Sequence, residues 1–214
     1  MQIRPASDHS LLVVLGEGIS REIHLRVLRL VQLLAGSPPP GLVDLHPAYA
    51  SVLVRFNPIV TSRDALEREV RERVADLDEA PAPEPRIVEI PVRYGGAEGP
   101  DLEDVARLSE LSMEEVVRLH SEGDYLVYFL GFSPGFPYLG GMSPRLAVPR
   151  LEVPRSETPA GSVAIGGSQT GVYPLKSPGG WRIVGRTPLS LFSLERDPPV
   201  LLRMGDRVRF VPLP

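Results

Sequence analysis

One stretch decides the fold of the second half of this chain: Gly131-Phe132-Ser133-Pro134-Gly135-Phe136-Pro137-Tyr138-Leu139-Gly140-Gly141. Glycine weakens a helix and proline removes one of its hydrogen bonds, so this run excludes a long helix. The bias continues from Phe132 to Pro188, where Gly and Pro make up 19 of 57 residues. Short apolar runs between glycine turns are typical of a small β-barrel, and the sequence predicts one here.

The barrel prediction extends to both sides of this region. We expect extended segments at Ser162–Ile165, Val172–Leu175, Trp181–Val184 and Arg207–Val211. Before the glycine-rich region, the pattern predicts a helix near Leu102–Leu108 and a strand at Tyr125–Leu130. Between them, Ser112 and Glu115 fit the capping-box pattern that starts a second helix.

The N-terminal region has the alternating elements of a ferredoxin-like α+β domain. Apolar residues predict a strand at Leu11–Leu15, a helix over Ile19–Leu34, strands at Leu42–His46 and Ser51–Phe56, and a helix over Leu66–Leu77. A last strand at Ile87–Val92 completes the βαββαβ order, although that strand could instead open the next domain.

A change in composition divides the chain into two domains. The stretch Glu79-Ala80-Pro81-Ala82-Pro83-Glu84-Pro85 alternates proline, which stiffens a chain into an extended spacer. We therefore expect a ferredoxin-like α+β domain over residues 1–83 and a mainly-β barrel domain over residues 84–214.

Composition excludes several classes of function. A formal charge of −4 over 214 residues gives no electrostatic attraction to nucleic acid or to an anionic membrane, and we expect neither partner. No apolar run reaches the roughly 20 residues that cross a bilayer, and no secretory leader is recognisable, so we expect a cytoplasmic protein. Without cysteine, thiolate catalysis and thiolate metal sites are excluded.

Three glycine-rich blocks, 131–141, 159–161 with 166–174, and 177–188, carry all the candidate binding residues except Arg155. Rigid loops with exposed N–H groups suit a binding pocket, aromatic side chains can line it, and guanidinium groups can hold a carboxylate or phosphate. Gln169 offers both a donor and an acceptor to an amide such as a lactam. The substrate-binding candidates are Phe132, Phe136, Arg155, Gln169, Thr170, Trp181, Arg186 and Thr187.

Each of these candidates also has a purely structural interpretation. Glycines provide the turns of a barrel, aromatic residues fill its core, and arginines in an arginine-rich chain are often solvated surface groups. The residues alone leave both interpretations open. A binding role for Phe132, Phe136, Gln169, Trp181 and Arg186 requires that they approach one another in the folded chain.

No catalytic residue can be assigned from the sequence. His9, His24, His46 and His120 lie outside the glycine-rich blocks and show no metal-ligand spacing, so we expect no metal site. The GxxxxGK[ST] phosphate loop and the GxGxxG dinucleotide signature are both missing. We expect this chain to bind no cofactor.

The same blocks resemble a known family. The segments 131–141, 159–161 with 166–174, and 177–188 are similar to the KipI and PxpB family, also labelled allophanate hydrolase subunit 1 or carboxyltransferase subdomain. The likeness extends upstream through Tyr94-Gly95-Gly96 and Pro100-Asp101-Leu102, and more loosely through the N-terminal region. The resemblance implies an α+β domain followed by a cyclophilin-like barrel.

The resemblance also implies a function. PxpB-like proteins assemble with a KipA/PxpC-like subunit and a PxpA-like subunit, and the complex opens 5-oxo-L-proline to L-glutamate with ATP as co-substrate. Two alternatives remain open: a KipI-like inhibitor that binds a sporulation-type histidine kinase, and the carboxyltransferase component of a urea carboxylase and allophanate system.

Overall fold

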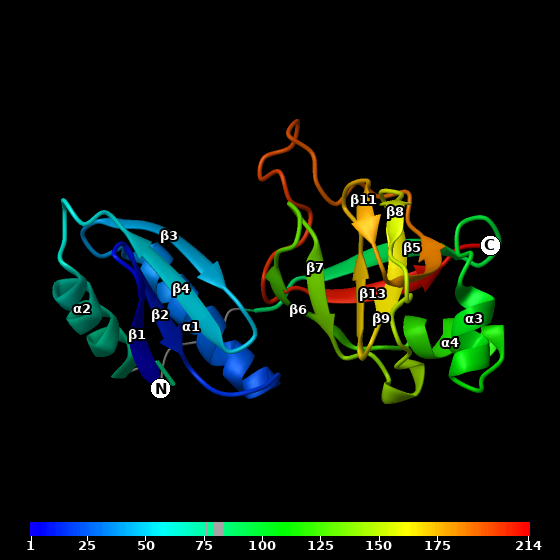
Figure 1. Cartoon of the computed structure of the whole chain (residues 1–214), viewed down its shortest axis with the longest axis horizontal. Helices are drawn as coiled ribbons and strands as arrows, with labels where there is room; N and C mark the ends of the chain where they lie inside the picture. The colour runs from blue at the N-terminus through cyan, green and yellow to red at the C-terminus, as the bar shows by residue number, and fades with distance from the viewer. Residues whose placement is uncertain (76, 79–83) are drawn as a thin grey trace. The chain divides into compact units, whose positions relative to one another are not determined.

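The computed structural model describes residues 1–75, 77–78 and 84–214. These residues form two compact units, Met1–Glu84 and Pro85–Pro214 (Figure 1). Most of the proline-rich spacer expected at residues 79–85 lies outside the described residues.

The N-terminal unit is one antiparallel sheet covered by two helices. Its strands are β1 (Gln2–Ser7), β2 (Ser10–Val14), β3 (Leu42–Pro47) and β4 (Ser51–Phe56), in the order β1-β2-β4-β3. Helix α1 (Arg21–Gly36) packs against β3 and β4, and helix α2 (Arg63–Ala75) packs against β2.

Apolar periodicity explains this unit. Strand β4 buries Val52 and Val54 on alternate positions, and α2 buries Leu66, Val70 and Val74 at helical spacing. The start of α1 is fixed by Ser20, whose side chain accepts a hydrogen bond from the Ile23 N–H at 3.1 Å. The sheet face and the helix stripes therefore share one core.

The expected βαββαβ order is wrong, and the ferredoxin-like assignment is not confirmed. The observed order is ββαββα, because the edge strand beside β2 is Gln2–Ser7 and not Ile87–Val92. Most side chains of Gln2–Ser7 are exposed, so this strand carries no apolar alternation. A short hairpin to Ser10 also costs less loop-closure entropy than a strand returning from residue 87.

The second unit is a closed seven-stranded barrel. Its strands are β5 (Ile87–Tyr94), β6 (Tyr125–Leu130), β7 (Pro137–Gly140), β9 (Ser162–Gly166), β10 (Gln169–Val172), β12 (Arg182–Arg186) and β13 (Arg207–Pro212). They follow the order β10-β7-β6-β13-β5-β12-β9, and β9 pairs with β10 to close the barrel. The barrel is mixed, because β13 runs parallel to β5 while the other pairs are antiparallel.

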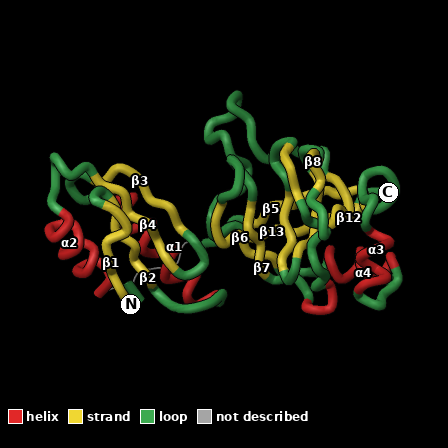
Figure 2. The backbone as a smooth tube through the Cα atoms, viewed as in Figure 1, coloured by secondary structure: helices red, strands yellow, loops and turns green. Residues whose placement is uncertain are grey.

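Smaller elements surround the barrel. Helix α3 (Leu102–Leu108) packs on β12, and helix α4 (Met113–Ser121) packs on β13 and on the 3₁₀ turn η1 (Pro144–Leu146) (Figure 1). The predicted capping box of Ser112 and Glu115 begins α4 and is confirmed. A two-stranded ribbon, β8 (Arg155–Thr158) with β11 (Ser177–Gly179), completes the unit (Figure 1). Figure 2 shows the strands of this unit in yellow and its helices α3 and α4 in red.

The barrel prediction is confirmed, with local differences. The segments Tyr125–Leu130 and Leu102–Leu108 have the predicted bounds. The extended segment expected at Val172–Leu175 is wrong except for its first residue, because the strand spans Gln169–Val172 and ends there. Strands β7, β8 and β11 are too short to give a sequence signal. Within residues 1–75, 77–78 and 84–214, no helix has the length and apolar character to span a bilayer.

Candidate functional site

An aromatic pocket of about 280 Å³ lies beside the barrel strands. Its lining residues are Phe132, Phe136, Tyr138, Arg150, Leu151, Pro154, Tyr173, Pro178, Gly179, Gly180 and Trp181. The Phe136 ring is central: its centroid lies 5.5 Å from that of Phe132, 5.3 Å from that of Tyr173 and 5.7 Å from that of Trp181. Edge-to-face rings at these separations form rigid pocket walls.

A tight loop holds Phe132 at the rim of the aromatic pocket. The Ser133 N–H donates to the Gly131 carbonyl at 2.7 Å, and the Gly131 N–H donates to the Phe136 carbonyl at 3.0 Å. Phe132 takes a φ of 64°, which is uncommon for a residue with a side chain, and its exposed fraction is 64%. Backbone strain combined with an exposed aromatic ring is typical of binding loops.

Glycine brings the backbone close to the Tyr173 ring in this pocket. A Cβ on Gly179 would lie 2.5 Å from the Tyr173 hydroxyl, so only glycine fits there. Burial raises the pKa of Tyr173, which stays a neutral phenol. The Arg150 guanidinium lies 5.6 Å from the centre of the Trp181 ring and supplies a positive charge to an otherwise apolar recess.

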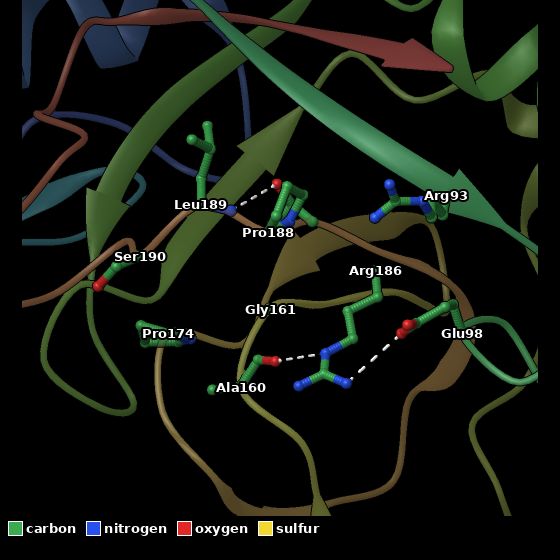
Figure 3. Close-up of a pocket in the computed structure, with 10 residues that line it drawn as sticks. Arg93, Glu98, Ala160, Gly161, Pro174, Arg186, Pro188, Leu189 and Ser190 are labelled. Carbon is green, nitrogen blue, oxygen red and sulfur yellow. Dashed lines mark hydrogen bonds and ion pairs between the residues drawn. The ribbon is translucent and has the colours of Figure 1, made fainter. Parts of the chain in front are cut away.

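A second pocket, of about 410 Å³, contains two arginines, and we call it the arginine pocket. Its lining residues are Arg93, Glu98, Ala160, Gly161, Pro174, Arg186, Thr187, Pro188, Leu189 and Ser190. Figure 3 shows the Arg186 side chain reaching between Ala160 and Glu98. The Arg186 Nε donates to the Ala160 carbonyl at 2.9 Å, and Nη1 lies 3.5 Å from a Glu98 carboxylate oxygen.

Arg155 does not line either pocket, because a buried carboxylate holds it. Its Nη2 lies 2.6 Å from Asp101, whose side chain has an exposed fraction of 7%. The second oxygen of Asp101 accepts from the Ile183 N–H at 2.6 Å. This arrangement fastens the ribbon β8–β11 and helix α3 to the barrel, which is a structural role.

Thr170 belongs to a buried hydrogen-bonded chain inside the barrel. His120 has no solvent exposure, and burial lowers its pKa to about 3, so its imidazole is neutral. Its Nδ1 lies 2.7 Å from the Tyr94 hydroxyl and its Nε2 lies 2.8 Å from the Thr170 hydroxyl, which donates to the Ala164 carbonyl at 3.0 Å. One arrangement of protons satisfies all three bonds: Tyr94 donates to Nδ1, and Nε2–H donates to Thr170.

The structure brings only part of the predicted constellation together. Phe132, Phe136 and Trp181 share the aromatic pocket, whereas Arg186 and Thr187 line the arginine pocket. Gln169 stands opposite Gly166 in the β9–β10 pairing and lines neither pocket. Of the five residues expected to approach one another, only Phe132, Phe136 and Trp181 therefore share a pocket, while Arg186 lines the other pocket and Gln169 lines neither.

Sequence reasoning missed the residues that complete each pocket. Arg93 reaches Arg186 through the pairing of β5 with β12, and Glu98, 88 residues away from Arg186 in sequence, reaches it from the turn after β5. Arg150 stands in a region without a motif. His120 lacks metal-ligand spacing, yet inside the barrel it forms hydrogen bonds with Tyr94 and Thr170. Within the part of the chain that the structure describes, no three metal-ligating side chains cluster.

A family model and curated relatives both match this chain along most of its length. The family model "Carboxyltransferase domain, subdomain C and D" matches residues 1–202. The chain is 45% identical to the B-type subunit of 5-oxoprolinase from Bacillus subtilis (strain 168), over 98% of this chain and 92% of that protein. It is 52% identical to the B-type subunit of 5-oxoprolinase from Escherichia coli O157:H7, over 87% of this chain and 84% of that protein.

A solved structure agrees in fold. The crystal structure of TTHA0988 superposes with a TM-score of 0.85 and 42% identity, and it covers all of this chain. The match spans 40% of the TTHA0988 chain, so that protein contains more than this chain does. Since the family model and both curated relatives match along most of its length, the chain belongs to the carboxyltransferase subdomain C and D family, in the branch of the B-type 5-oxoprolinase subunits.

Proposed function

We propose that this chain is the B-type subunit of an ATP-dependent 5-oxoprolinase, which opens 5-oxo-L-proline to L-glutamate in the cytoplasm. The observation that carries the proposal is the 45% identity to a B-type 5-oxoprolinase subunit over 98% of this chain. A relation of that extent includes both compact units and all three glycine-rich blocks, so it is not limited to a shared barrel.

The chemistry of the reaction requires more than this chain offers. A lactam is unreactive, and transfer of a phosphoryl group from ATP to its carbonyl oxygen would activate it before water opens the ring. The sequence has no cysteine, and no histidine lines either described pocket. The arginine pocket contains one carboxylate, Glu98, which is paired with Arg186. We therefore assign binding to this chain and the reacting groups to PxpA-like and PxpC-like partners.

The proposed contacts with 5-oxoproline remain those of the glycine-rich blocks. Phe132, Phe136 and Trp181 offer an apolar surface that suits one face of a five-membered ring. Arg186, at the end of β12, and Thr187, directly after it, offer polar groups in the arginine pocket. Arg155 and Thr170 act indirectly in this scheme, because their side chains are bonded to Asp101 and His120.

Reconstitution tests the proposal. The isolated chain should show neither ATP hydrolysis nor ring opening, whereas the chain mixed with its PxpA-like and PxpC-like partners should form glutamate and phosphate together. The matched control omits only this chain. Robust turnover by the isolated chain, or full turnover by the partners without it, would exclude the proposed role.

One observation favours a second function, inhibition of a histidine kinase by direct binding. Phe132 is 64% exposed at the rim of an aromatic pocket, and an exposed aromatic ring is typical of protein interfaces. Co-purification separates the two functions. Recovery of PxpA-like and PxpC-like proteins supports the oxoprolinase, and recovery of a histidine kinase that is lost with Phe132→Ala supports the inhibitor.

A further inference from the structure

Two arginines face each other across a strand pair at the arginine pocket. Arg93 on β5 and Arg186 on β12 are direct partners in the antiparallel register. Side chains in such a pair project from neighbouring positions, and like charges directly opposite destabilise a sheet. Both arginines also line the pocket of about 410 Å³ (Figure 3). The barrel therefore places two positive charges together where solvent can enter.

Neighbouring protein groups neutralise these charges only in part. The contact between Glu98 and Arg186 is long, at 3.5 Å, and the two side chains are 40% and 44% exposed. The Arg186 Nε is used by the Ala160 carbonyl. Among the described residues, neither Arg186 Nη2 nor any guanidinium nitrogen of Arg93 has an acceptor within hydrogen-bond distance. Donors remain available for a ligand with two acceptor oxygens.

The loops around the arginines are held in place. Gly161 has a φ of +83°, and a Cβ there would fall on the carbonyl oxygen of Thr187, so the loop can approach β12 only with glycine. The Thr187 N–H donates to the Gly161 carbonyl at 2.9 Å. Pro174 and Pro188 fix the backbone on either side. Such a frame orients the guanidinium of Arg186 before any ligand arrives.

We propose that Arg93 and Arg186 together form an oxyanion-binding site that holds a carboxylate or a phosphate group through their free guanidinium nitrogens. The identity of this ligand rests on the proposed function. The carboxylate would be that of 5-oxoproline, and the phosphate would be that of ATP or of a product of ATP hydrolysis. The Glu98 carboxylate then competes with the ligand for Arg186, and binding of the anion displaces it.

Direct binding to the full chain tests the site without its partners. Isothermal titration calorimetry in a phosphate-free, low-salt buffer would measure the dissociation constant of 5-oxoproline in one arm and of inorganic phosphate in the other. Arg93→Ala and Arg186→Ala should each weaken binding about ten- to a hundredfold, because a charge-assisted hydrogen bond is lost. Arg186→Lys should recover only part of the loss, since an ammonium cannot replace a bidentate fork. Arg145→Ala, which removes an exposed arginine on η1, is the control for net charge.

Glu98→Gln gives the sharpest result, because the two explanations predict different effects on anion binding. If Glu98 competes with the ligand, removing its charge should strengthen anion binding about fivefold, the effect of one unit charge at about 4 Å in a water-like medium. If Arg93, Glu98 and Arg186 only stabilise the barrel, Glu98→Gln should lower the free energy of unfolding and leave the affinity for the anion unchanged.

The two arms distinguish the sources of the anion. Tighter binding of 5-oxoproline than of phosphate indicates a carboxylate site, and the reverse order indicates a phosphate site. Binding that Arg93→Ala and Arg186→Ala do not weaken, or no binding at all, overturns the proposal. An active reconstituted oxoprolinase would still support the function in that case. An inactive complex built from a chain that binds anions through both arginines would refute the function and leave the site standing.

Discussion

Removing the carboxylate of Asp101 should destabilise the barrel unit strongly, although Asp101 lies outside both pockets. Asp101 has an exposed fraction of 5% and accepts from the Ile183 N–H and from Arg155, both at 2.6 Å. In Asp101→Ala, the Ile183 N–H is left buried and unpaired, which costs about 1–3 kcal/mol. Arg155 also loses its partner, and because its side chain is 31% exposed, water recovers part of that loss.

The sum of these terms is about 3 kcal/mol of unfolding free energy. For a unit of this size that corresponds to roughly 10 °C in melting temperature. Trp181 is the only tryptophan of the chain and is buried in the barrel unit, so its fluorescence follows that unit alone. Urea unfolding followed by Trp181 emission should therefore show a lower midpoint for Asp101→Ala than for the unchanged chain. The slope of the unfolding free energy against urea concentration should stay the same.

A double-mutant cycle with Arg155→Met separates the ion pair from the backbone contact. The effect of the double mutant on the unfolding free energy should differ from the sum of the two single effects by more than about 0.5 kcal/mol, because Asp101 and Arg155 are each other's partners. Glu89→Ala, at an ion pair with Arg209 that is 61% exposed on both sides, is the control and should cost less than about 0.5 kcal/mol. A barrel midpoint in Asp101→Ala equal to that of the control would refute this reasoning.

Three further results are expected. Gly161→Ala should destabilise the barrel by at least about 1–2 kcal/mol, because φ there is +83° and its Cβ would lie 2.4 Å from the Thr187 carbonyl oxygen. Gly180→Ala, whose Cβ would meet its nearest atom at 3.5 Å, should be nearly neutral in the same Trp181 assay. Burial lowers the pKa of His120 from 6.5 to about 3, so the unfolded chain binds the extra proton and stability falls as pH drops below 6.5. Between pH 7 and pH 5 the loss should be about 2 kcal/mol, and equal urea midpoints at the two pH values would contradict it. Limited proteolysis should cut first between Asp78 and Arg86, where the sequence predicts an extended proline spacer, and early cuts elsewhere with none in this range would argue against it.

The sequence alone determined the elements with strong local patterns. Apolar alternation predicted β4 at Ser51–Phe56, and helical spacing predicted α3 at Leu102–Leu108, each with the observed bounds. The density of Gly and Pro after Gly131 predicted the barrel. These signals are readable because each depends on a few consecutive residues, whose propensities and periodicity act over one turn or one strand.

The tertiary structure decided the pairings that make the candidate sites. Gln2–Ser7 takes the edge position expected for Ile87–Val92, because a hairpin to β2 closes a shorter loop. Arg155 pairs with Asp101 and lines neither pocket, and Thr170 bonds to His120 inside the barrel. Arg93 meets Arg186 only because β5 pairs with β12. Contacts between residues far apart in sequence depend on strand order and register, and those follow from how the whole core packs, which no local pattern specifies.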